Sequence, residues 1–153
     1  MTRGEVRFVH LANLLVGGTG VVYAVMRYLM KPTDEWSIVN HPWQPHAQHL
    51  HVLIAPMLVL AGGILWRHHV SEKLRSGDRR GIRSGLLLVA LFVPMIASGS
   101  LIQITVAEAW RQVWVWVHLV STGAWLIGFA VHWARPRKTT AVVPCAVDTG
   151  SSP

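Results

Sequence analysis

Four long apolar runs, separated by short polar segments, limit what this chain can fold into more than any other feature. They lie at about residues 8–30, 48–66, 84–106 and 112–133. Each is close to the ~20 residues that a helix needs to cross the hydrocarbon core of a bilayer. Because backbone polar groups in lipid must be bonded within their own segment, such runs form helices. The pattern predicts an all-α integral membrane protein, a four-helix bundle over residues 1–138 followed by a tail at 139–153 of disordered composition.

The composition supports a membrane protein and excludes several other classes. Hydrophobic residues make up 52% of the chain and charged residues only 14%, against about 25% charged in soluble domains. The net charge of +7 comes from residues between the apolar runs, so membrane topology explains it better than nucleic-acid binding does. One cysteine, Cys145, supports neither a disulfide framework nor a cysteine-ligated metal site. There is also no glycine-rich phosphate loop and no constellation of a serine or cysteine nucleophile.

The distribution of lysine and arginine predicts the orientation. Three lie on one side of the predicted membrane, at the end of the first run, just after it, or between the third and fourth runs: Arg27, Lys31 and Arg111. The other eleven lie at the two ends of the chain and between the second and third runs: Arg3, Arg7, Arg67, Lys73, Arg75, Arg79, Arg80, Arg83, Arg135, Arg137 and Lys138. Cytoplasmic segments carry the excess of these cations. We therefore expect a multi-pass protein of the bacterial inner membrane with both termini in the cytoplasm.

Two histidines of the fourth run, His118 and His132, are the main candidates for function. They are 14 residues apart, which places them on one helical face about 21 Å apart along the axis. Intramembrane imidazoles are costly unless they face the protein interior with a partner. The predicted topology gives each a partner at the same depth: His51 with His118 on the outer side, and His10 with His132 on the inner side.

Paired imidazoles at two depths suit two flat metal cofactors. Neutral imidazole ligates haem iron, and two axial imidazoles leave no open position for a substrate or for oxygen. A site of this kind transfers single electrons. The histidines therefore predict two bis-histidine haem b groups, with His10 and His132 on the inner iron and His51 and His118 on the outer iron.

The arrangement resembles the four-helix membrane cytochrome b family, which includes bacterial cytochrome b561 and the membrane subunits of formate dehydrogenase and nickel-iron hydrogenase. The matching residues are His10, His51, His118 and His132, and the likeness covers roughly residues 8–133. The resemblance implies an electron-transfer subunit of an oxidoreductase system rather than a stand-alone enzyme. Its implied partners are the quinone pool and a redox protein such as a dehydrogenase or a cytochrome c.

His49 is an alternative ligand on the second helix, although His51 lies deeper in the apolar run.

Other interpretations stay open at this point. The histidines around the start of the second helix could form an outer-side transition-metal site in a small transporter or metal-handling protein: His41, His46, His49 and His51. A structural anchor subunit with one haem or none is a further alternative. His41, His46, His68 and His69 fit ordinary interfacial residues. The tryptophans of the fourth helix fit an interfacial belt and helix packing better than an electron path.

Overall fold

The computed structural model describes residues 1–32, 34–76 and 82–134, and all regular structure within them is helical. The elements are α1 (Arg3–Tyr28), α2 (Gln44–Leu65), the π-helical segment η1 (Trp66–Val70), α3 (Ser71–Ser76), α4 (Ile82–Ile104) and α5 (Glu108–Ala134). The all-helical prediction is confirmed for this part of the chain. The predicted tail at 139–153 lies outside the described residues.

Four helical stretches are long and apolar enough to cross a membrane: Arg3–Tyr28, Gln44–Ser76, Ser84–Ile104 and Glu108–Ala134. Large apolar side chains on their outer surfaces stay exposed, among them Leu14, Leu53 and Ile127. A soluble protein would bury far more of this surface, whereas lipid tails solvate it well. The structure thus has the apolar exterior of a multi-pass membrane protein.

The second helical stretch is longer at both ends than the sequence predicted. It begins at Gln44, with Pro45 in its first turn, where proline lacks only an N–H that has no partner within the helix. It was expected to end near Trp66, but it continues through η1 and α3 to Ser76. The charged residues that follow Trp66 end the apolar run without ending the helix, because lysine, arginine and glutamate are themselves good helix formers.

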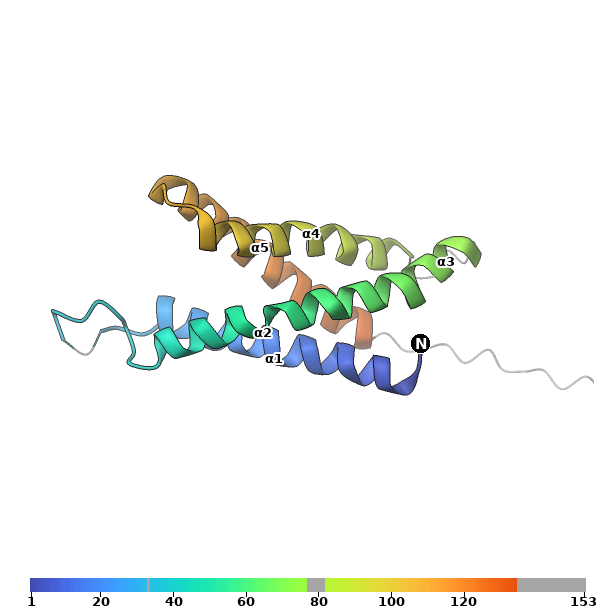
Figure 1. Ribbon diagram of the computed structural model, residues 1–153, viewed down its shortest axis with the longest axis horizontal. Coiled ribbons are helices and arrows are strands. Elements are labelled where there is room, and N and C mark those ends of the chain that lie inside the picture. The colour runs from blue at the N-terminus through green and yellow to red at the C-terminus, as the bar shows by residue number, and fades with distance from the viewer. Residues whose placement is uncertain (33, 77–81, 135–153) are drawn as a thin grey trace, which may run out of the picture.

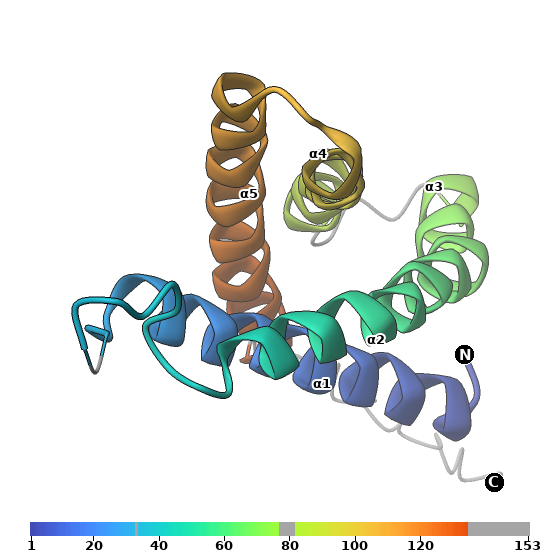
Figure 2. The same ribbon diagram turned by 60° about the vertical axis from the view of Figure 1, so that its left-hand side comes forward.

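The helices pack as two hairpins, α1 with α2 and α4 with α5. Figures 1 and 2 show that α5 crosses α1 at a steep angle, so the two hairpins do not lie parallel along their whole length. The two hairpins meet near the middle of their helices. A methyl group at Gly62 would lie only 2.3 Å from Phe92 Cζ of the other hairpin, and one at Gly17 would lie 2.9 Å from Leu126 Cδ2. Glycine at these two positions permits the close approach of the hairpins.

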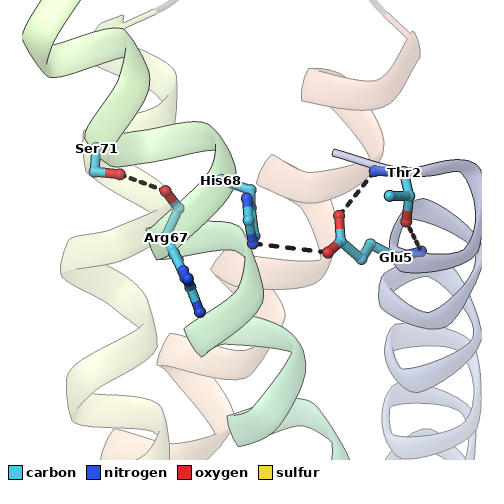
Figure 3. A network of polar contacts seen from close by, with 5 residues as sticks. All are labelled: Thr2, Glu5, Arg67, His68 and Ser71. Carbon is cyan, nitrogen blue, oxygen red and sulfur yellow. Dashed lines mark hydrogen bonds and ion pairs between the residues drawn. The ribbon is translucent and has the colours of Figure 1, made fainter.

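A polar network joins the start of α1 to η1 (Figure 3). Thr2 and Glu5 form a capping box, in which Glu5 Oε2 accepts a hydrogen bond of 2.8 Å from the Thr2 backbone N–H. The other carboxylate oxygen, Oε1, lies 3.7 Å from His68 Nε2. His68 was expected to be only an interfacial residue. Its contact with Glu5 helps to hold the start of α1 against η1.

Candidate functional site

His51 is half-buried on α2 and is held by α1. Its Nδ1 lies 3.0 Å from the carbonyl oxygen of Val16 and 3.3 Å from Thr19 Oγ1. A carbonyl oxygen only accepts hydrogen bonds, so the proton of the neutral ring is on Nδ1. Nε2 then carries a free lone pair. This is the tautomer that histidine ligands adopt when a second group orients them.

His118 on α5 is held by α4 in the same way. Its Nδ1 lies 2.9 Å from the carbonyl oxygen of Met95 and 3.3 Å from Ser98 Oγ. In both hairpins the first helix supplies a carbonyl oxygen and, three residues later, a hydroxyl. The two imidazoles therefore have the same tautomer, with Nε2 unprotonated in each.

A glycine of the neighbouring helix lies close to each of these imidazole rings. A methyl group added at Gly20 would lie 2.9 Å from His51 Cε1, and one at Gly99 would lie 3.1 Å from His118 Cε1. Each glycine directly follows the hydroxyl residue that contacts the same ring, Thr19 or Ser98. The sequence interpretation did not single out these two pairs. The signal that could have found them is a hydroxyl residue followed by glycine, on the helix that precedes each outer histidine.

The two supported imidazoles face each other across the hairpins. The ring centres of His51 and His118 are 6.4 Å apart, and the ring planes are inclined at 70°. Two imidazoles that ligate one metal ion from opposite sides, through bonds of about 2 Å, have ring centres roughly 6 Å apart. The ring-centre distance between His51 and His118 is therefore close to that of two imidazoles on a single central ion.

An unsatisfied hydroxyl lies near His118. Among the described residues, Thr122 Oγ1 is a buried side-chain oxygen without a hydrogen-bond partner. Thr122 lies one turn after His118, on the same face of α5. Leaving a buried hydroxyl unpaired costs about 1–3 kcal/mol, so a polar group or water beside it would stabilise this part of the structure. The sequence interpretation missed this residue as well.

His10 and His132, the predicted inner pair, lie on α1 and near the other end of α5. His132 Nδ1 is 3.3 Å from Ser84 Oγ of α4, which repeats the hydroxyl contact seen at His118. The ring of His10 on α1 lies 5.6 Å from that of Phe129 and 5.9 Å from that of Trp133, measured between centres. These two aromatic residues precede and follow His132 in the chain. The structure therefore brings His10 to the part of α5 that carries His132.

The remaining histidines of the outer side are dispersed. His49 is exposed, which makes His51 the better placed of the two candidates on α2. His41 Nδ1 accepts a hydrogen bond of 3.1 Å from the Trp43 backbone N–H, and the His46 ring packs against the Trp43 ring at 5.7 Å. Within the described ranges, no group of three or more His, Cys, Asp or Glu side chains could hold a metal ion. The alternative of an outer-side site built from these histidines gains no support from their placement.

Comparisons with protein families, with curated proteins and with solved structures find no match to this chain.

Proposed function

We propose that this protein is a dihaem membrane cytochrome b that transfers electrons across the bacterial inner membrane. Its function is to connect the quinone pool with a partner redox protein, as an electron-transfer subunit rather than a stand-alone enzyme. Both termini are placed in the cytoplasm on the lysine and arginine distribution. In this proposal His51 and His118 would hold the iron of the outer haem, and His10 and His132 that of the inner haem.

The observation that carries the proposal is the geometry of His51 and His118. The rings stand 6.4 Å apart across two hairpins, and each Nδ1 is directed to a backbone carbonyl. Each Nδ1 bond by itself joins the two helices of one hairpin, as an interhelical hydrogen bond does. The ligand role is favoured because both rings use Nδ1 for that bond, which leaves Nε2 unprotonated in each and available to a metal.

The chain's own residues set the properties of the site between His51 and His118. Haem supplies reversible one-electron chemistry when it is bound. Val16 and Met95 fix the ring tautomers through their carbonyl oxygens, and Thr19 and Ser98 limit ring rotation. With two imidazoles as axial ligands, no position on the metal is left for oxygen or a substrate. The four histidines therefore favour electron transfer over oxygen activation.

Haem content of histidine variants tests the proposal. His51→Ala and His118→Ala should each lower the haem content from two per chain to one, measured as pyridine haemochrome against protein concentration. His49→Ala is the matched control, two residues from His51 on the same helix but exposed, and it should keep both haems. His132→Ala and His10→Ala should each remove the other haem. Unchanged haem content in His51→Ala and His118→Ala, or loss of the outer haem in His49→Ala, would contradict the assignment.

A further inference from the structure

Trp125 occupies a position that no other described tryptophan of α5 shares. It is seven residues from both His118 and His132, so it lies two turns, or roughly 10 Å along the axis, from each level. Its side chain is only 5% exposed, whereas Trp110, Trp116 and Trp133 are 61%, 65% and 72% exposed. The expected interfacial belt fits these three residues. Trp125 agrees instead with the expected helix packing, because it lies in the core, between the two proposed haem sites.

A hydrogen bond between the hairpins holds the indole in place. Trp125 Nε1 donates to Asn13 Oδ1 of α1 over 2.9 Å, and Asn13 Nδ2 donates to the carbonyl oxygen of Val9 over 2.9 Å. Asn13 is 6% exposed, and a buried polar pair at this depth is costly unless both partners are bonded. Because Asn13 is tied to its own helix, it fixes the height and the orientation of the indole. The hydrophobic packing alone would fix neither as firmly.

Aromatic rings continue from Trp125 in two directions. Phe92 of α4 packs on the indole with ring centres 5.0 Å apart, and Phe129 stacks on it at 6.4 Å with planes inclined by only 17°. Phe129 in turn lies 5.6 Å from the ring of His10, a proposed inner ligand. A series of π systems therefore runs from the middle of the bundle to the inner level.

We propose that Trp125 is the bridging side chain for electron transfer between the two sites, and that Asn13 is its positioning residue. The inference rests on the dihaem function proposed above. In the step concerned, one electron leaves one site and arrives at the other, so that one is oxidised as the other is reduced. No proton or atom moves, and the indole itself is neither oxidised nor reduced. The delocalised electrons of the indole lie between the two proposed haem sites. An aliphatic side chain at this position would couple the two sites only through σ bonds and across packing gaps.

Substitutions at Trp125 separate aromatic character from packing. The purified holoprotein is placed in liposomes with an oxidant inside and a reductant outside, and the rate of electron transfer is measured beside the haem content and the Soret circular dichroism. Trp125→Leu should keep two haems per chain and an unchanged Soret spectrum while electron transfer slows by on the order of tenfold, equivalent to about 1.4 kcal/mol in the barrier. Trp125→Phe should restore most of the rate. Trp116→Leu, which removes a lipid-facing tryptophan of the same helix, should change none of the three readouts.

Asn13→Leu provides a second variant, which keeps the indole and removes its hydrogen bond. It should slow transfer by a smaller factor than Trp125→Leu while retaining both haems. The inference is overturned if Trp125→Leu retains two haems and transfers electrons at the wild-type rate. It is also overturned if both Trp125→Leu and Asn13→Leu lose haem, since the pair would then serve the structure of the sites. A wild-type protein without haem would instead contradict the proposed function itself.

Discussion

At the scale of single residues, the imidazoles of His51 and His118 are positioned by neighbouring glycines, which have no side chain, as much as by their hydrogen bonds. Gly20 and Gly99 leave room for rings that any larger side chain would displace. Small residues inside transmembrane helices usually allow helices to approach each other. Here the approaching group is an imidazole of the partner helix, so each glycine directly affects the position of that ring.

Replacing Gly20 by alanine tests this role of the glycine. The new methyl group would lie 2.9 Å from His51 Cε1, so the ring must move and the outer haem should bind about tenfold more weakly, equivalent to about 1.4 kcal/mol. Gly18→Ala is the matched control, because a methyl group there meets nothing within 4 Å. Alanine is also the better helix former, so Gly18→Ala should retain both haems. Titration of the haem-free protein with haemin measures both affinities, and equal affinities in the two variants would show that Gly20 has no such role.

The sequence pointed to these histidines as candidates, but not to the groups that orient them. The shared helical face of His118 and His132 follows from their 14-residue spacing, and their expected depths follow from the charge bias. By contrast, the bonds from His51 to Val16 and Thr19 depend on which face of α1 packs against α2. Nothing local to either helix determines that packing. Thr122 was missed for a related reason, because a threonine hydroxyl in a helix ordinarily bonds to its own backbone and only the structure shows that this one does not.

At the scale of the elements, the contact of the Phe92 side chain of α4 with α2 depends on one glycine. A methyl group at Gly62 would lie 2.3 Å from Phe92 Cζ, and Phe92 is itself packed on Trp125. The Phe92 ring therefore has little room to retreat. Such overpacking typically costs about 1–3 kcal/mol.

Gly62→Ala should accordingly lower the free energy of unfolding by about 1–3 kcal/mol, measured by thermal or denaturant unfolding in detergent. Gly63→Ala is the control at the next residue, where a methyl group meets nothing within 4 Å. It should be neutral or should stabilise the helix by up to about 1 kcal/mol. If both variants unfold at the same midpoint, Gly62 is not the contact that limits the approach of the hairpins.

Helix existence was predicted well from the apolar runs, whereas several helix ends were not. The sequence interpretation placed the end of the second helix near Trp66, where the apolar run stops, and the structure continues to Ser76. The length of an apolar run reflects the thickness of the bilayer. The length of a helix also depends on the helix propensity of the residues that follow the run and on their contacts with other parts of the chain. One such contact is that of His68 with Glu5, which forms because the start of α1 lies beside η1.

At the scale of the whole molecule, the proposed topology can be tested with single cysteines. Cys145 is the one natural cysteine, and under the proposal it lies in the cytoplasm. In intact cells it should resist a membrane-impermeant maleimide and react only after permeabilisation. In a Cys145→Ser background, Ile38→Cys should react without permeabilisation, because Ile38 lies in the loop between α1 and α2 and is 93% exposed. The opposite pattern would invert the topology and exchange the inner and outer sites.

The central claim is that two haems bind this chain, each between two imidazoles from different helices. The most direct measurement is the haem stoichiometry of the purified wild-type protein, combined with exposure of the reduced protein to carbon monoxide. We expect two haem b per chain and no spectral change with carbon monoxide, because bis-histidine ligation leaves no free axial position. A colourless protein would contradict the claim, and so would a haem that binds carbon monoxide readily.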